Sequence, residues 1–250
     1  MANKTQAIRG NFDFVVPAII PSFVRGEDAE ALYNEVGETI KSYVWYDADS
    51  KTMKGSSTFL AARVDSIVRN LGNGIRVATL ADLSGPEVME MVEDNFYSDT
   101  PAIVLRSIED DHGPDNALIK KLAPMIEDKM GRLKLPVLVT GFDVVPSKDR
   151  NGYGLDIVAR DDFEVIQDER LLGKYDGKKF STVDEQGLPN FDRSGSRTWY
   201  AKNKGLSGLF LCGSLDLDSR CGDDDLACSA EDGRVVLVRD AIAGAERSKK

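Results

Sequence analysis

The sequence predicts an α/β protein, in which a parallel-sheet region of the α/β/α type is followed by a β-rich segment of short antiparallel strands. Two observations lead to this prediction. Segments with helical periodicity alternate with short apolar segments in the first part of the chain, an order typical of crossover units that build a parallel sheet. After the turn formers at 146–152, the segments become short and rich in β-formers. We therefore expect an α/β region over residues 1–146 and a β-rich segment over 147–250, packed on or beside it.

The first two helices are indicated by their apolar stripes. A helix from about 26 to 43 has apolar residues three or four positions apart, and Glu27 and Asp28 place negative charge at the positive end of its dipole. A second helix is expected over 57–71. It should end at Gly72, because glycine readily adopts the left-handed conformation found just beyond many helices.

Two more helices follow the same periodicity. Ser84 and Glu87 have the spacing of a capping box for a helix over 86–97, in which each side chain bonds to the backbone N–H of the other. The last helix of the set covers 115–130 and contains Pro124. We expect this proline to kink or split it, because proline lacks a backbone donor.

Short apolar segments separate these helices and have the composition of buried strands. They cover 75–80, 102–106 and 136–140. In the C-terminal part, strands are expected at 153–159, 163–167, 180–183, 197–200, 206–211, 215–217 and 234–238. Glycine and asparagine lie between them, which favours hairpins or a meander of antiparallel strands.

The composition argues against two classes of partner. The 250 residues include 32 basic and 42 acidic ones, so the formal charge is -10 and the pI is about 4.8. Phosphate backbones and anionic lipids repel a protein of this charge, which disfavours nucleic acid and membranes as partners. The early apolar stretch 12–24 is interrupted by Asp13, Pro17 and Pro21, and no secretory signal is recognisable. We expect a soluble, cytoplasmic protein.

A first candidate site follows from the predicted parallel sheet, because ligands of such sheets bind beyond the carboxyl ends of the strands. Asp82, Asp110 and Asp111 would meet there and could hold Mg²⁺ through carboxylate oxygens. His112, the only histidine, would be the proton shuttle. The two residues expected to face an anionic group are Ser84 and Arg106. The competing interpretation is that these residues cap helices and form solvated turns.

A second candidate is an aspartate-rich loop that invites a Ca²⁺ interpretation. The predicted ligands are Asp216, Asp218, Asp223 and Asp225. Their spacing does not fit an EF-hand loop, because Arg220 stands where the third oxygen ligand belongs. The alternative is an exposed hairpin loop whose charge blocks edge pairing.

A third candidate is a recognition surface that combines aromatic and cationic side chains. Arg197, Trp199 and Tyr200 are its central residues. Such a surface can stack on bases or meet an acidic partner, and the overall charge favours a protein partner. Packing of Trp199 and Tyr200 inside the fold is the competing interpretation.

The sequence contains neither a phosphate-binding P-loop nor a nucleophile elbow, and Gly72-Asn73-Gly74 precedes a strand, so it is not a dinucleotide fingerprint. We therefore interpret the chain as a binding or assembly protein without catalysis of its own, acting through a protein partner or self-association. The alternative is a divalent-metal-dependent hydrolase or phosphoryl-transfer enzyme that uses the Asp82/Asp110/Asp111/His112 cluster. No resident cofactor is expected, and Mg²⁺ or Ca²⁺ are the candidate ions.

Overall fold

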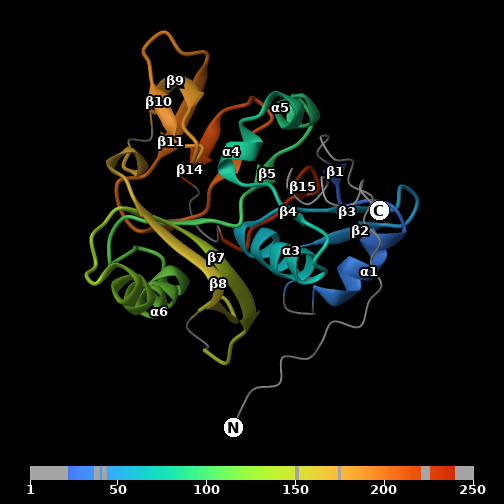
Figure 1. The fold of residues 1–250 in the computed structure, drawn as a ribbon, viewed down its shortest axis with the longest axis horizontal. Coiled ribbons are helices and arrows are strands. Elements are labelled where there is room, and N and C mark those ends of the chain that lie inside the picture. Colours follow the sequence, from blue (N-terminus) through green and yellow to red (C-terminus); the bar gives the residue numbers. More distant parts are fainter. Residues whose placement is uncertain are drawn as a thin grey trace, which may run out of the picture.

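The computed structural model describes residues 22–36, 40, 44–149, 152–173, 176–220 and 226–239. Its strands form four sheets, and nearly all of the strand pairs are antiparallel (Figure 1). The prediction of a parallel-sheet region of the α/β/α type is therefore wrong. The protein is a mixed α/β fold in which the parallel arrangement is restricted to one strand pair among the described residues.

The three-stranded sheet joins the two ends of the described chain. It has the strand order β1-β15-β4 and is antiparallel throughout. Its strands are β1 (Ser22–Phe23), β15 (Val236–Arg239) and β4 (Ile75–Val77). The C-terminal strand thus lies between two strands from the first third of the sequence. A separate hairpin consists of β2 (Trp45–Asp47) and β3 (Thr52–Lys54).

The second sheet has the order β12-β6-β7-β8 and contains the longest strands. They are β12 (Leu206–Ser207), β6 (Ile103–Leu105), β7 (Val137–Pro146) and β8 (Leu155–Gln167). β7 and β8 form a long hairpin that dominates the lower part of Figure 1. The two strands predicted at 153–159 and 163–167 are one continuous strand, β8.

The third sheet is mixed and has the order β10-β9-β11-β14-β13-β5. Its strands are β10 (Pro189–Phe191), β9 (Lys178–Val183), β11 (Arg197–Ala201), β14 (Leu217–Ser219), β13 (Phe210–Leu211) and β5 (Ser98–Asp99). β11 and β14 are its parallel pair. The β9–β10 hairpin projects from the top of the molecule in Figure 1. The short strands predicted after residue 147 are confirmed here, and they pair in antiparallel fashion except for β11 with β14.

The parallel prediction failed because periodicity shows which residues are buried and leaves open which strands pair. Three apolar segments, 75–80, 102–106 and 136–140, were expected in one sheet. β4 pairs instead with β15, and β6 pairs with β7 in antiparallel register, Val104 opposite Leu138. The helix between them, α6 (Gly113–Met130), therefore connects two antiparallel strands and is not the crossover of a parallel β-α-β unit. The carboxyl ends of these strands therefore do not share an edge.

The helices are α1 (Glu27–Glu35), α3 (Thr58–Asn70), α4 (Leu80–Leu83), α5 (Pro86–Val92) and α6 (Gly113–Met130), with a 3-10 turn η1 (Glu169–Leu171). α3 packs against both β4 and β7, and α6 packs against β8. The second, third and fourth predicted helices thus exist within a few residues of their expected bounds. The first is described over 27–35 and again at Ile40.

Three local expectations differ from the structure. The capping box lies one element earlier than predicted, between Thr79 and Asp82 at the start of α4, and Ser84 ends that helix. Pro124 does not split α6, which remains one helix over 18 residues. Leu80, expected to end a strand, begins α4.

The apolar interior has two parts. One lies around α3, between the first and second sheets, and contains Phe59, Ile67 and Phe142. The other lies under the mixed sheet and contains Trp199, Phe180 and Leu188. The first part includes residues from both sides of the division into two regions that was expected at residue 146. That division stays a prediction. In the described part of the chain, no helix has the length and apolar character needed to cross a bilayer.

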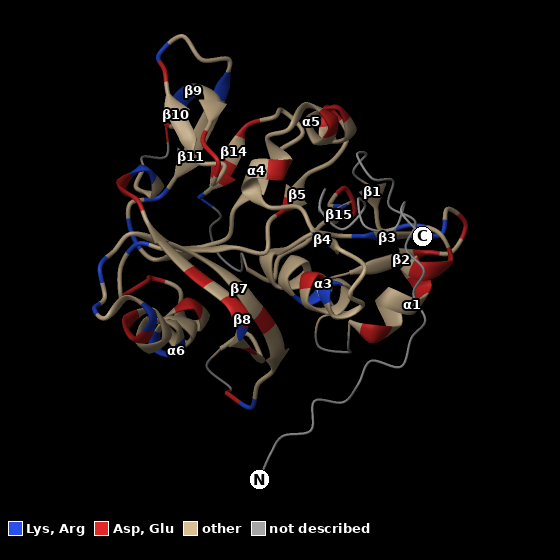
Figure 2. Ribbon diagram, in the orientation of Figure 1, with Lys and Arg blue, Asp and Glu red and all other residues tan. Residues whose placement is uncertain are grey.

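Acidic residues recur along β8 (Figure 2), whose sequence includes Asp161, Asp162 and Glu164. This strand also carries Arg160. It borders the hollow described next.

Candidate functional site

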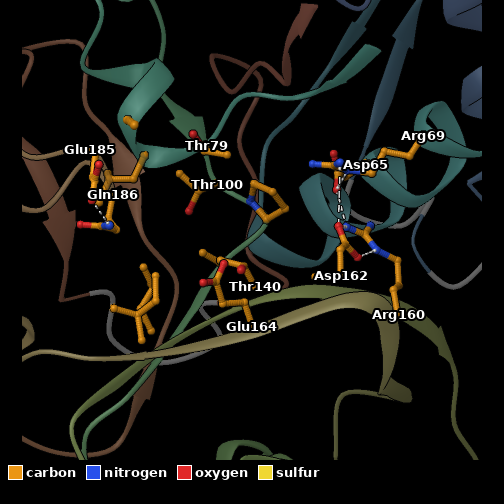
Figure 3. A pocket seen from close by; sticks show the side chains of 17 residues that line it. Asp65, Arg69, Thr79, Thr100, Thr140, Arg160, Asp162, Glu164, Glu185 and Gln186 are labelled. Atoms are coloured by element: carbon orange, nitrogen blue, oxygen red, sulfur yellow. Dashed lines mark hydrogen bonds and ion pairs between the residues drawn. The ribbon is translucent and has the colours of Figure 1, made fainter. Parts of the chain in front are cut away.

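A cleft with a volume of about 500 Å³ is the candidate site (Figure 3). It lies where α3, the start of α4, the loop before β6, the β7–β8 hairpin and the β9–β10 turn meet. Its volume falls in the range of small-molecule sites. The charged residues that line it are Asp65, Arg69, Arg160, Asp162, Glu164 and Glu185.

A bulge in the β7–β8 hairpin brings two of these charged residues to the cleft. Thr140 pairs with Glu164 and Phe142 with Ala159, so residues 160–163 of β8 face only Gly141. Gly141 has a φ of 69°, and a Cβ there would overlap the backbone of residue 162. Only glycine allows this close approach. The bulge interrupts the regular alternation of side chains along β8, which is how bulges redirect residues at functional sites.

Asp65 anchors the charged end of the cleft, and its side chain is only 1% exposed. Oδ1 accepts a hydrogen bond from the backbone N–H of Val77 at 2.9 Å, and Oδ2 accepts from Arg69 and Arg160 at 2.8 Å each. Arg160 also donates to both oxygens of Asp162 at 2.9 Å. Burial alone would lower the pKa of Arg160, but the hydrogen bonds to Asp162 and the charge of Asp65 raise it. Arg160 in turn lowers the pKa of Asp162. Both guanidinium groups are therefore engaged by carboxylates, although Arg160 Nη1 is buried without a partner among the described residues.

The β9–β10 turn forms the other end of the cleft, where Glu185 and Gln186 lie in Figure 3. Gly187 follows them with a φ of 82°, and a Cβ there would overlap the backbone of Ala81 in α4. Asp184 closes the turn, because its Oδ1 accepts from the backbone N–H of Gln186 at 3.0 Å. The turn is thus docked directly on the start of α4.

The middle of the cleft combines a carboxylate with an apolar wall. Thr140 and Glu164 lie side by side there as a register pair of β7 and β8 (Figure 3). The Glu164 side chain is exposed and makes no ion pair with another described residue. The adjacent wall includes Pro101, Leu138 and Ile166. This arrangement suits a ligand that carries both positive charge and apolar groups.

The predicted metal cluster is not assembled. Asp82 lies in α4, where its carboxylate accepts from Arg76 Nη1 at 2.5 Å and from the Thr79 hydroxyl at 2.6 Å. Burial would raise the pKa of Asp82, but these bonds outweigh it and lower the pKa. Asp110 lies in a different part of the fold, after β6. The shared strand edge on which this grouping depended does not exist. The metal-dependent enzyme itself stays a prediction from the sequence.

Asp110 and Asp111 instead fasten the loop after β6. Asp110 Oδ2 accepts from the backbone N–H of Leu206 at 2.7 Å, and its Oδ1 accepts from the N–H of His112 at 3.1 Å. Asp111 is exposed and pairs with Lys204 at 2.5 Å. These contacts join the loop to β12. They agree with the competing interpretation, in which these aspartates form turns and cap helices.

His112 belongs to a group of three side chains at the start of α6. Its Nδ1 lies 3.4 Å from the Tyr153 hydroxyl and 3.6 Å from Asp115 Oδ2. The Tyr153 hydroxyl donates to Asp115 Oδ1 at 2.5 Å. Burial raises the pKa of Asp115, partly offset by the tyrosine bond. None of the three lines the cleft, and they connect the β7–β8 hairpin to α6.

Of the three residues predicted for recognition, one is buried and two are half-buried. Trp199 is buried in the core under the mixed sheet. Tyr200 lies beneath the guanidinium of Arg220 at 3.9 Å, and Arg197 lies 4.7 Å from the ring of Phe180. These contacts correspond to the packing interpretation of the aromatic residues.

The two residues expected to face an anion have other surroundings. The Ser84 hydroxyl is buried at the end of α4 without a partner among the described residues. Arg106 is buried and donates to Leu171 O, Ser207 Oγ and Ser219 Oγ at 2.7, 2.7 and 2.8 Å. Its guanidinium joins β6, β12 and β14.

The predicted calcium ligands are only partly described, since Asp223 and Asp225 lie outside the described residues. Asp216 Oδ1 accepts from the backbone N–H of Thr198 at 2.5 Å, and Asp218 pairs with Arg220 at 2.6 Å. Within the described ranges, no group of three or more His, Cys, Asp or Glu residues could hold a metal ion.

A second hollow, of about 490 Å³, borders β5 and β13 and includes Tyr97, Cys212 and Asp232. The Tyr97 hydroxyl donates to Ser56 O and accepts from the backbone N–H of Ala230, so it is already used. Burial raises the pKa of Cys212 to about 12, which keeps the thiol protonated and unreactive at neutral pH. This hollow therefore offers no activated group.

The sequence reasoning missed the residues of the cleft. Arg160 and Asp162 fell in the gap between two predicted strands, and Asp65 stood inside a predicted helix as an ordinary polar residue. One available signal was Gly141, because a glycine directly after an apolar strand segment can mark a bulge. The pairing of Asp65 with Arg160 carried no signal in the sequence.

Comparison with protein-family models, curated proteins and solved structures gives no match for this chain. The cleft is therefore interpreted from its own chemistry.

Proposed function

We propose that the protein is a binding protein that takes up a small cationic organic molecule in the cleft, without catalysis of its own. The observation that supports this most directly is the charge of the lining. Four carboxylates face two guanidinium groups there, a formal charge of -2. The two arginines are already engaged by Asp65 and Asp162. The charge of Glu164 and Glu185 is therefore left for a ligand.

The local hydrogen bonds support the same direction. Glu185 Oε1 accepts from the neutral amide of Gln186 at 3.1 Å, which satisfies one oxygen without cancelling its charge. A cation is attracted to the carboxylates more strongly beside this partly apolar lining than in bulk water, because the effective dielectric constant is lower there. The overall charge of -10 attracts cations over a longer distance as well.

A binding role fits the groups that line the cleft. Among its described residues are threonines, carboxylates and arginines, and no serine, cysteine or histidine. A serine or cysteine nucleophile paired with a histidine base, a common signature of covalent catalysis, is not among them. We assign the carboxylates to ligand recognition.

The test compares three probes of equal chain length and different charge. Thermal melts are recorded with 1,4-diaminobutane, 1,4-butanediol and succinate at the same concentration and ionic strength. A ligand at a hundredfold its Kd stabilises the native state by about 2.7 kcal/mol. We expect the diamine alone to raise Tm. Equal stabilisation by succinate or the diol would contradict the proposal.

Two variants locate the effect. Glu164→Gln removes one charge from the cleft and should reduce the shift caused by the diamine. Glu127→Gln, an exposed position on α6, is the matched control and should leave it unchanged. A protein partner, self-association and a cytoplasmic location stay predictions from the sequence. Analytical ultracentrifugation of the purified chain tests self-association.

A further inference from the structure

We infer that the ligand of the cleft is a linear oligoamine, a molecule with two or more ammonium groups separated by methylene segments. This rests on the proposed function, and it specifies the ligand class.

The first argument is the distribution of the carboxylates. Figure 3 shows Glu185 at one end of the cleft and Glu164 in the middle beside Thr140. Asp162, at the far end, is already paired with Arg160. The three carboxylates come from the β9–β10 turn and from β8. A compact ion with one charge can approach only one of these positions closely. A molecule with several ammonium groups along its length can approach more than one at a time.

The second argument is the surface between these charges. Pro101, Leu138 and Ile166 line the cleft together with Leu80 and Ala102. Apolar surface of this kind favours contact with methylene groups, because such contact removes both from water. A small inorganic cation would leave this wall hydrated.

The third argument is the supply of hydrogen-bond acceptors. Each ammonium group donates up to three hydrogen bonds. The cleft offers the carboxylate oxygens of Glu185 at the turn and of Glu164 in the middle. The hydroxyl of Thr140 and the side-chain carbonyl of Gln186 are further acceptors. Arg69 and Arg160 are each engaged by a carboxylate, and the one guanidinium nitrogen of Arg160 without a partner among the described residues, Nη1, is buried. An anionic group on the ligand would therefore meet Glu164 with little cationic compensation.

The experiment is calorimetric titration of the full chain with butylamine, 1,4-diaminobutane and spermidine, which carry one, two and three amines. We expect a stoichiometry of one and an affinity that rises at least tenfold from butylamine to spermidine. Added salt should weaken spermidine binding more than butylamine binding, since charged contacts are screened.

Variants separate the cleft from the acidic surface. Glu164→Gln/Glu185→Gln should lower the spermidine affinity at least tenfold, toward that of butylamine. The matched control Glu127→Gln/Asp128→Asn removes two exposed charges from α6 and should change it less than twofold. Circular dichroism of both variants checks that the fold is retained, which we expect because all four side chains are exposed.

The outcomes distinguish the two proposals. If butylamine binds as tightly as spermidine at one site, the oligoamine inference is wrong while the cationic-ligand function stands. If several spermidine molecules bind weakly and both double variants reduce binding alike, the amines bind the general surface and the inference is wrong. If no amine binds, the proposed function fails with it.

Discussion

Arg160 donates from Nη2 to Oδ2 of Asp65 at 2.8 Å, across 95 residues of sequence. One residue lies in the bulged strand β8 and the other in α3, so this contact holds the hairpin against the helix. The Asp65 carboxylate is 1% exposed and the Arg160 side chain 17% exposed. The charged end of the cleft is thus part of the framework of the fold as well as of its candidate site.

Asp65→Asn should destabilise the protein, because it leaves Arg160 in a largely buried position with less compensating charge. Breaking one partner of a buried ion pair typically costs about 3 kcal/mol or more. Urea unfolding measures the change in the free energy of unfolding. Asp161→Asn, on the exposed neighbouring position, is the control and should change it by less than about 0.5 kcal/mol. Equal effects of the two substitutions would contradict the prediction.

Gly141→Ala should disturb the bulge. The glycine has a φ of 69°, and its Cβ would overlap the carbonyl of Asp162. We expect a loss of about 2 kcal/mol or more in unfolding free energy, from strain and from the steric overlap, and weaker amine binding. Gly131→Ala has a similar φ of 74° with open space around the Cβ, so it isolates the strain. An amine affinity that is unchanged in Gly141→Ala would show that the bulge does not position the site.

Asp99 should make stability depend on pH. It is buried in β5, its Oδ2 accepts no hydrogen bond from the described residues, and burial raises its pKa to about 7. Between its ordinary pKa of 3.8 and pH 7, the folded chain keeps a proton that the unfolded chain has released. The stability from the protonated form is therefore fully present below about pH 4 and is lost as pH rises to about 7.

Replacement by asparagine tests this. The slope attributable to one group is about 1.4 kcal/mol per pH unit. The stability of Asp99→Asn relative to the natural sequence should increase by roughly 4 kcal/mol between pH 4 and pH 7. Chemical unfolding at five pH values measures it, with the exposed Asp128→Asn as control. A constant difference over this range would mean that Asp99 is ionised in the folded protein.

Arg106→Lys should be destabilising although it preserves the charge. The planar guanidinium donates at once to Leu171 O, Ser207 Oγ and Ser219 Oγ, and an ammonium group cannot reproduce this fork. We expect a loss of about 2 to 4 kcal/mol, because buried acceptors would lose their donors. Arg132→Lys, on an exposed residue after α6, should be neutral in the same denaturation measurement.

Periodicity located the helices well because it reflects local burial. Ser57 was expected near the start of a helix, and its side chain accepts from the N–H of Leu60 at the start of α3. The segments at 75–80 and 102–106 also contain β4 and β6, and the segment at 136–140 covers the first part of β7, which continues to Pro146. Pairing is a different matter, because a strand of a few apolar residues can form hydrogen bonds with many partners.

The candidate site shows the same limit. Asp82, Asp110 and Asp111 were grouped on the assumption of one shared strand edge, and the antiparallel pairing of β6 with β7 removes that edge. The cleft instead depends on Gly141, which places residues 160–163 opposite a single position. Gly141 was a local sequence signal for the bulge. The contact between Arg160 in the bulge and Asp65 in α3 joins residues 95 positions apart, and no local pattern predicts it.

The sequence by itself determined the positions of the main helices, the acidic character of the protein and the presence of short strands in its C-terminal part. These properties depend on residue type and on spacing within about one or two turns. The tertiary structure alone decided that β15 lies between β1 and β4, and that Asp65, Asp162 and Glu164 meet at one cleft. The reason is that strand pairing and burial of charge are settled by contacts between distant segments, whose free energies the local sequence pattern does not contain.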